Sequence, residues 1–438
     1  MNSHRKMITF IILIMMCVSL IAGCGKEQNQ NQKAVTSTSN AAVKTAIYPK
    51  SISFNDYDNQ MKNRDEDQLD KSFIKSLDDF TYISSSRLLS GSSRNISYSP
   101  TSLYMALSIA GTGAKNATQD EIFSVLGTRG KGIDYISGQN KKLFNLLYSD
   151  NEIKKLKIAN SVWLQKNISF KKAFIDNTVN NFYASIFNID FGDKNSSKLL
   201  SNWISENTNG VLSPQISTDK NQIMSILNTI YYKNEWTDKF DENKTKPDTF
   251  YPSDRLNVQC DFMNITYGAH GFIKGEGFTA SYLDLKNGDR MLFVLPDKGV
   301  SVKSLLSTPQ KAATLFQVKN MMSGKVIFQI PKFSYGNSLN LNDTLKGMGI
   351  KSAFEKNADF SGITDGIAFI SNIKQQTHVA INEDGVEAAA FTKIDFAGSA
   401  MPKNEAAEMI LNRPFIYAIE SSDSRILFIG VVNNPAEE

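Results

Sequence analysis

Hydrophobic positions along the chain follow two spacings, one typical of helices and one typical of strands. Ser99 and Pro100 precede apolar residues at helical spacing, and a proline just inside the first turn favours a helix start. Polar and apolar residues alternate over residues 158–164, which predicts a strand, and helical spacing follows over residues 170–187. Residues 222–232 form a long, mostly apolar run that suits a central strand.

Three later apolar runs lie next to prolines, which cannot donate a hydrogen bond to a sheet and so tend to mark strand ends. The runs are residues 291–295 before Pro296, residues 326–330 before Pro331, and residues 425–432 before Pro435. Together with the helical segments they predict an α+β fold with a large mixed sheet. We find no internal repeat, so residues 65–438 are interpreted as a single domain.

The first 24 residues have the pattern of an export signal. Arg5 and Lys6 precede an apolar stretch, residues 8–21, that is too short to span a bilayer. The sequence Ile-Ala-Gly-Cys at residues 21–24 resembles a bacterial lipobox, which implies cleavage after residue 23 and acylation of Cys24. We therefore expect a lipoprotein signal peptide and a mature chain that is lipid-anchored to the cell membrane, facing outside. A plain signal peptide or an uncleaved anchor is the alternative.

Residues 24–64 differ in composition from the rest of the chain. They are rich in Gln, Asn, Ser, Thr and Lys and contain few large apolar residues. Such a segment cannot bury enough apolar surface to offset the entropy lost on ordering, which predicts a flexible tether. The alternative is an N-terminal arm that docks on the domain.

Charge and cysteine content narrow the possible functions. The formal net charge is +4, and two of the positive charges lie in the signal segment, so nucleic acid is not an expected partner. Of the three cysteines, Cys17 lies in the signal and Cys24 would carry lipid, which leaves Cys260 without a disulfide partner. Cys260 lies in an alternating apolar stretch and is interpreted as a core residue rather than a nucleophile.

Sequence motifs of catalytic sites are absent. His270 and His378, the two histidines beyond the signal, do not form a His-Glu-x-x-His zinc motif. There is no Gly-x-Ser-x-Gly nucleophile elbow and no phosphate-binding glycine loop. Ser72 and Ser169 each begin a Ser-x-x-Lys pattern, but the companion Lys-Thr-Gly is missing. We therefore expect neither an enzyme nor a metal or cofactor site.

Residues 382–396 hold the most informative pattern. Read with a period of two, one face is small or apolar and the other is mixed and partly charged, as in a strand buried on one side. The first face comprises Val386, Ala388, Ala390, Thr392, Ile394 and Phe396, and the second comprises Glu387, Ala389, Phe391, Lys393 and Asp395. The Glu-Ala-Ala-Ala core nevertheless favours a helix over a strand. This conflict fits a segment with two conformations, and an ordinary helix start or edge strand is the alternative.

Residues 382–390, Asn-Glu-Asp-Gly-Val-Glu-Ala-Ala-Ala, resemble the hinge of the reactive loop in serpins. Further stretches are similar to this family in order and spacing over nearly the whole domain. They are residues 95–102, 113–118, Trp203 with residues 207–210, and residues 227–236, 331–333, 358–360, 413–415 and 428–435. The resemblance implies a serpin fold, with a large mixed central β-sheet, surrounding helices and an exposed reactive-centre loop at about residues 385–411.

The resemblance also implies a suicide-type inhibitor of serine endopeptidases. The protease would cut the loop and form an acyl-enzyme, and the freed loop would insert into the sheet and distort the protease before deacylation. The expected partner is therefore a serine endopeptidase in a covalent complex, and the inhibitor itself is expected to be a monomer. The residues implied for the hinge are Glu383, Gly385, Val386, Glu387, Ala388, Ala389, Ala390 and Thr392.

Other residues are implied to lie where the sheet parts. Glu383 would pair with Lys332, and Trp236 would pack beside this pair. A hydrogen-bonded cluster would be formed by Ser99, Ser102 and Asn228. Each of these residues could instead be an ordinary core or capping residue.

One position in this region departs from the family pattern. The family commonly has a histidine eight residues before the hinge glutamate, where this chain has Gln375. His378 lies an odd number of residues further on, so it should face the other side of the strand. Gln375 can still donate and accept hydrogen bonds.

The usual distance from Glu383 places the scissile bond at Ser399–Ala400, with Ala400–Met401 nearly as good. Small residues at this site imply an elastase-like or subtilisin-like target. The loop up to Arg413 is a few residues longer than usual. Two other functions remain open: a non-inhibitory serpin acting as a surface binding protein, and a solute-binding lipoprotein, which fits the anchor but none of the ordered matches.

Overall fold

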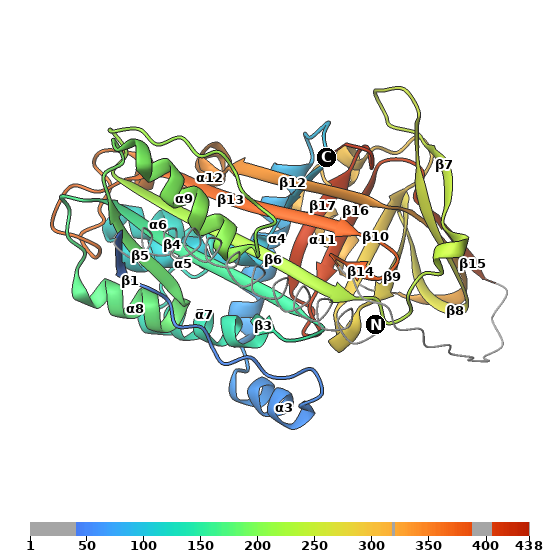
Figure 1. Cartoon of the computed structure of the whole chain (residues 1–438), viewed down its shortest axis with the longest axis horizontal. Helices are drawn as coiled ribbons and strands as arrows, with labels where there is room; N and C mark the ends of the chain where they lie inside the picture. Colours follow the sequence, from blue (N-terminus) through green and yellow to red (C-terminus); the bar gives the residue numbers. More distant parts are fainter. Residues whose placement is uncertain (1–40, 318–319, 388–404, 438) are drawn as a thin grey trace, which may run out of the picture. The chain divides into compact units, whose positions relative to one another are not determined.

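The computed structural model of the chain describes residues 41–317, 320–387 and 405–437. From Val43 onward the chain forms one compact unit, and residues before it belong to a separate unit. Figure 1 shows the course of the chain through its helices and strands. The predicted signal peptide, Cys24 and the tether up to residue 40 lie outside the described residues.

The first of two sheets contains eight strands within the described residues. Their order is β1 (Ala42–Lys44), β5 (Ala184–Ile189), β4 (Lys155–Gln165), β6 (Met224–Glu235), β14 (Gly385–Val386), β13 (Ile370–Ile381) and β12 (Phe333–Asn340), with β3 (Ser149–Asp150) paired to β4. In Figure 1, β4, β6, β13 and β12 run side by side. Strands β6 and β13 are parallel to each other, whereas the short β14 is antiparallel to both.

The second sheet contains nine strands in the described part of the chain. Their order is β15 (Ala406–Ile410), β11 (Met322–Pro331), β8 (Val258–Gly275), β9 (Phe278–Asp284), β10 (Arg290–Pro296), β16 (Phe415–Glu420), β17 (Ile426–Val432) and β2 (Ile96–Tyr98), with β7 (Lys246–Phe250) paired to β8. Strand β15 follows the predicted reactive loop in sequence and pairs in parallel with β11. Strands β14 and β15, on either side of the predicted loop in sequence, thus belong to different sheets.

Helices surround the sheets. They are α3 (Tyr57–Glu66), α4 (Lys71–Leu89), α5 (Pro100–Gly113), α6 (Asn116–Val125), α7 (Ile133–Leu147), α8 (Lys172–Phe182), α9 (Lys194–Asn207), α10 (Val302–Leu305), α11 (Pro309–Phe316) and α12 (Asn342–Met348), with 3-10 turns η1 (Glu242–Lys244), η2 (Lys286–Gly288) and η3 (Ser352–Phe354). None of the helices in the described ranges is long and apolar enough to cross a membrane.

Two helices cover opposite faces of the first sheet. Helix α9 lies over β4, where Trp203 packs edge-on against Trp163 with ring centroids 6.4 Å apart. Helix α5 lies on the other face, where the amide of Asn228 on β6 donates to the hydroxyl of Ser102. Helix α5 thus covers the inner face of the sheet where β6 and β13 pair, and it contacts the sheet directly.

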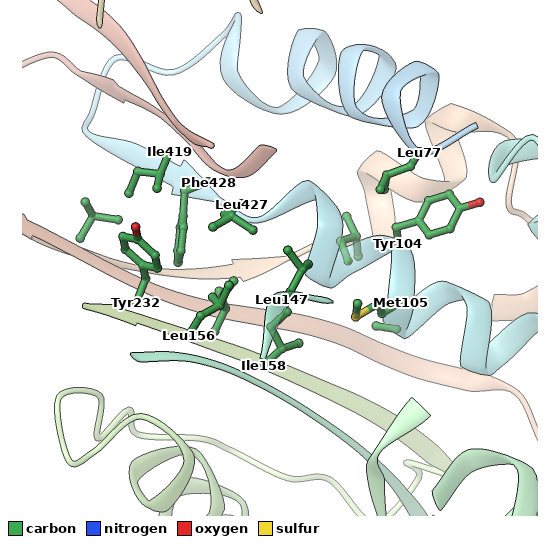
Figure 2. Packing of buried hydrophobic residues seen from close by; sticks show 14 of the residues in the cluster. Leu77, Tyr104, Met105, Leu147, Leu156, Ile158, Tyr232, Ile419, Leu427 and Phe428 are labelled. Atoms are coloured by element: carbon green, nitrogen blue, oxygen red, sulfur yellow. The ribbon is translucent and has the colours of Figure 1, made fainter. Parts of the chain in front are cut away.

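The main core lies between this inner face, the second sheet and helices α4 and α5. Figure 2 shows Leu156 and Ile158 of β4 and Tyr232 of β6 among the side chains of this cluster, with Leu427 and Phe428 of β17 opposite. The rings of Tyr232 and Phe428 lie 6.3 Å apart. Burial of apolar side chains in this cluster stabilises the fold by about 1.5–3 kcal/mol for each large side chain.

Most predicted elements are confirmed. Helix α5 begins at Pro100, and the hydroxyl of Ser99 accepts a hydrogen bond from the backbone of Ser102 at 3.2 Å. The predicted strands at residues 158–164, 222–232, 291–295, 326–330 and 425–432 correspond to β4, β6, β10, β11 and β17. Cys260, predicted to be a core residue, lies in β8 at the edge of the core, where it is partly buried and packs against the core residues.

The helix predicted over residues 170–187 is wrong in its last five residues. Helix α8 ends at Phe182, where Tyr183 takes a left-handed conformation with φ of 49°. Ala184 to Ile189 then form β5, which pairs in parallel with β4. By spacing alone, the apolar residues of this segment fit a helix. The segment instead pairs with the buried strand β4, and this pairing satisfies its backbone hydrogen bonds.

Residues 41–64 do not behave as a free tether. Tyr48 stacks on Phe144 and Tyr148, with ring centroids 6.0 Å and 5.4 Å away. Lys44 forms an ion pair with Asp176 at 3.2 Å. This part of the chain fits the docked arm that the sequence left open, and it shows that contacts with the domain begin well before residue 65.

Candidate functional site: a hinge at the opening of the sheet

Strand β14 occupies the point where β6 and β13 separate. Along most of their shared length these two strands pair directly with each other, from Ile370 with Met224 to Gln376 with Thr229. At the far end they diverge, and Val386 lies between them, paired with Asn234 on one side and Ile381 on the other. The hinge of the predicted reactive loop therefore already lies between β6 and β13, at the end where these strands diverge. Farther along, β6 and β13 pair directly with each other.

Gly385 fits this place because no side chain would. A Cβ atom at this position would lie 2.2 Å from the carbonyl oxygen of Asn234 and 2.8 Å from the Cα of Glu235. Both are backbone atoms of β6, so neither can move aside without disturbing the sheet. The glycine that the sequence assigned to the hinge therefore allows the chain to approach β6 closely.

The alternation predicted for the hinge is present at its first two positions. The Val386 side chain is fully buried and belongs to the main core. Glu387 points to the opposite face, where its carboxylate contacts the imidazole Nδ1 of His378. Its backbone has φ of 49°, and its N–H still donates to the carbonyl of Ala380 at 2.9 Å.

The rest of the reactive loop is not described. Ala388, Ala389, Ala390 and Thr392 of the predicted hinge, and Ser399, Ala400 and Met401 of the predicted scissile region, lie outside the described residues.

Glu383 and Lys332 are brought together as predicted. The ammonium group of Lys332 lies 3.1 Å from the Glu383 carboxylate, which also accepts a hydrogen bond from the hydroxyl of Thr245 at 2.8 Å. Burial alone would raise the pKa of Glu383, but hydrogen bonds from the backbone, Thr245 and Lys332 outweigh it, so the pKa lies below its ordinary value. Thr245, which lies just before β7, was not predicted.

Replacing Glu383 with Gln should destabilise the protein by about 1–2 kcal/mol near neutral pH, because a charge-assisted contact is lost. Since the folded state lowers this pKa, the contribution is fully present above the ordinary pKa of a glutamate and is lost as pH falls through the lowered value. Urea unfolding at pH 7 and at about pH 3 measures both quantities. This account would be contradicted if the free energies of unfolding of wild type and Glu383→Gln differed by the same amount at both pH values.

Trp236 closes the opening from the side of β6. Its indole N–H donates to the carbonyl of Asn382 at 2.9 Å, and its backbone N–H donates to the carbonyl of Asp384 at 2.9 Å. The side chain is buried and stacks edge-on against Phe240, whose backbone N–H donates to the carbonyl of Glu383. The predicted packing of Trp236 at the opening is thus present, and it fixes the turn between β13 and β14.

The predicted polar cluster lies beneath the paired part of β6 and β13. The side-chain amide of Gln375 donates to Asn228 Oδ1 at 2.7 Å and to the carbonyl of Ser99 at 3.0 Å, while its oxygen accepts from the Ser99 backbone at 2.8 Å. Asn228 in turn donates to Ser102 Oγ and to Asn160 Oδ1, the latter at 2.8 Å. We call these five residues the sheet-opening cluster; all are buried and none is ionisable.

Asn160 of β4 is the member of this cluster that was not predicted. Its Nδ2 atom is buried and has no hydrogen-bond partner. A buried asparagine in a strand that otherwise alternates apolar residues was the available signal. Through Asn160 the cluster links β4, β6, β13 and α5, so parting β6 from β13 must break the hydrogen bond that Gln375 donates to Asn228.

Comparison with known proteins decides the family. A family model described as serpin (serine protease inhibitor) matches residues 75–435, most of the chain. The chain belongs to the serpin family. Among curated serpins it is 29% identical to Serpin-ZXA of Oryza sativa subsp. japonica, covering 79% of this chain and 91% of that one. It is also 29% identical to human Serpin B3, covering 78% of this chain and 94% of the relative.

Solved serpin structures confirm the fold. Tengpin, a thermophilic serpin in its native state, matches with a TM-score of 0.77 and 26% identity over 90% of this chain and 99% of that chain. Human thyroxine-binding globulin in complex with its hormone matches with a TM-score of 0.74 and 26% identity, over 83% of this chain and 98% of that chain. The predicted serpin fold, with large mixed sheets and surrounding helices, is therefore confirmed.

Proposed function

We propose that this serpin inhibits serine endopeptidases by cleavage and insertion of its reactive loop. The observation that carries the proposal is the position of β14, which starts a new strand between β6 and β13 but ends after Val386. Below it, β6 and β13 are joined along a register of paired residues that a longer strand would separate. The family as a whole supports the same function, since serpins are generally protease inhibitors.

The register of the hinge predicts how far the loop would insert. Continuing the antiparallel pairing of Val386 with Asn234 places Phe396 opposite Met224, the first residue of β6. Continuing the pairing of Val386 with Ile381 places residue 397 opposite Ile370, the first residue of β13. Both neighbouring strands thus accommodate a strand that ends at residues 396–397. A scissile bond at Ser399–Ala400 would lie just beyond it, where an acylated protease remains attached.

The side chains of the loop suit this register. Residues 388, 390, 392, 394 and 396 would follow Val386 onto the core side, and all of them are small or apolar. About ten residues would gain ladder hydrogen bonds worth about 1 kcal/mol each, with apolar burial in addition. The total, on the order of 10 kcal/mol or more, is comparable to the whole stability of an ordinary protease domain.

The small residues at Ser399, Ala400 and Met401 support an elastase-like or subtilisin-like target. The test is to incubate the full chain with pancreatic elastase and with subtilisin, followed by denaturing gels and mass spectrometry. We expect a covalent adduct resistant to denaturation and a cut after Ser399 or Ala400. Protease with a blocked catalytic serine is the control and should give no adduct.

Cleavage without any adduct would overturn the inhibitory proposal and favour a non-inhibitory binding protein. Human thyroxine-binding globulin, a serpin solved with its hormone, has a fold similar to this chain. In this chain the described part of the hinge is free of proline, and its one charged residue after Gly385 is Glu387, on the face away from the core. That composition supports inhibition.

We also propose that the protein is exported and held on the outer side of the cell membrane by lipid on Cys24. The support is the sequence of residues 1–24, with its positive start, short apolar stretch and lipobox-like end. A target protease would then be met outside the cell.

A further inference from the structure

One ionic contact ties the hinge to the outer face of the sheet. Glu387 Oε1 lies against Nδ1 of His378, and the two side chains are 8% and 22% exposed. The other ring nitrogen of His378, Nε2, lies 3.2 Å from the hydroxyl of Ser334 on β12. The imidazole is therefore held between the edge strand of the sheet and the last described residue of the hinge.

Glu387 also reaches the strand on the other side of the opening. The Tyr231 hydroxyl of β6 hydrogen-bonds Glu387, and burial together with this carboxylate raises the pKa of Tyr231. Glu387 thus contacts β13 through His378 and β6 through Tyr231, across the same gap that β14 has begun to fill. The Glu387 side chain therefore connects β6 and β13, the two strands that the proposed loop insertion would separate.

Other charged groups lie near this contact, and the register of β14 with β6 places one of them, Lys233, opposite Glu387. Lys332, the residue before β12, forms an ion pair with Glu383 at 3.1 Å. Glu437 of the C-terminal segment, next to residues that border the hinge, is paired with Arg255 at 2.9 Å. The tyrosine on β6 remains neutral near pH 7, since its pKa is raised from an already high value. Histidine is the side-chain type whose unperturbed pKa lies nearest neutral pH, which distinguishes His378 from the carboxylates, lysines and tyrosine around it.

Solvent can reach the contact without opening the sheet. A cavity of about 410 Å³ lies beside it, bordered by Ser334, Asn382 and Glu387 among others. Protons can therefore exchange with the imidazole while the hinge stays in place.

We propose that His378 and Glu387 form a pH-dependent latch that holds the hinge in the sheet before any protease acts. When the imidazole is protonated it carries a positive charge and attracts the Glu387 carboxylate. When the proton is lost, the ion pair is lost and a weaker hydrogen bond from the neutral imidazole to the carboxylate remains. Mild acid should therefore dock the hinge, and a rise in pH should release it. This latch does not depend on inhibitory activity.

Native-state hydrogen exchange of the full chain tests the latch at the backbone N–H of Glu387, which donates to Ala380 only while the hinge is docked. After correction for intrinsic exchange, protection at this amide should fall about threefold to fivefold between about pH 6 and about pH 8. His378→Gln should flatten this dependence, and Glu387→Gln should do the same from the opposite partner.

His270→Gln is the matched control, because His270 is the other described histidine and lies on β8, where its Nε2 atom contacts the carbonyl of Tyr282 at 2.7 Å. This variant should keep the wild-type dependence on pH. An equal fall in protection in His378→Gln, or no fall in wild type, would overturn the latch. A protein that showed the latch but formed no protease adduct would refute only the inhibitory proposal.

Discussion

Cutting the reactive loop of this serpin should raise its midpoint of thermal unfolding by about 10–20 °C. Insertion of residues 387–396 between β6 and β13 would add on the order of 10 kcal/mol, and for a domain of this size each kcal/mol shifts the midpoint by about 1–2 °C. Differential scanning calorimetry of intact and nicked protein measures the shift. The nick is made by a short treatment with protease and checked by mass spectrometry.

The intact protein carried through the same steps without protease is the control. It should keep its original midpoint. If nicked and intact protein unfolded at the same temperature, the loop would have no more stable position to reach, and the proposed mechanism would lose its driving force.

Replacing Ala390 with Arg should convert the inhibitor into a substrate, with the covalent adduct reduced at least about tenfold while loop cleavage continues. In the register of the hinge, residue 390 falls opposite Ile230 of β6 and Thr377 of β13, both buried on the core side. An arginine there would be buried without a partner, which costs several kcal/mol and slows insertion until the acyl-enzyme is hydrolysed. Densitometry of adduct and cleaved inhibitor on denaturing gels gives the ratio.

Ala389→Arg is the matched control, since it adds the same side chain one residue away. Residue 389 falls opposite Tyr231 and His378, whose side chains lie on the outer face. It should retain most of the adduct. Equal losses in the two variants would show that the loop does not insert in the register that β14 begins.

The pattern of the hinge could be predicted because its two faces differ in composition. Val386 is buried and Glu387 is not part of the core, as the period-two pattern indicated. The pairing of Glu383 with Lys332 and the cluster of Ser99, Asn228 and Gln375 could be predicted from family resemblance alone. Neither spacing nor composition joins residues so far apart in sequence.

Other parts of the site could not be predicted because they depend on contacts made only in the folded chain. Thr245 and Asn160 join the site through side-chain hydrogen bonds to residues distant in sequence, Thr245 to Glu383 and Asn160 to Asn228. The odd offset of His378 correctly predicted that it faces away from Gln375, but its contact with Glu387 follows from the left-handed backbone at that residue. The docking of the N-terminal arm rests on contacts with distant residues, among them the stacking of Tyr48 on Phe144 and Tyr148.

The glutamine at position 375 has a consequence for how this serpin responds to the pH of its surroundings. Within the sheet-opening cluster, separating β6 from β13 disrupts only uncharged amide and hydroxyl groups, so the contribution of this cluster to the energy barrier should stay constant between mildly acidic and mildly alkaline media. The pH dependence that we propose lies instead at the contact between His378 and Glu387, where the loop leaves the sheet. A change of pH would then alter how readily the reactive loop is exposed to a protease. The energy that loop insertion releases against a bound protease would remain the same.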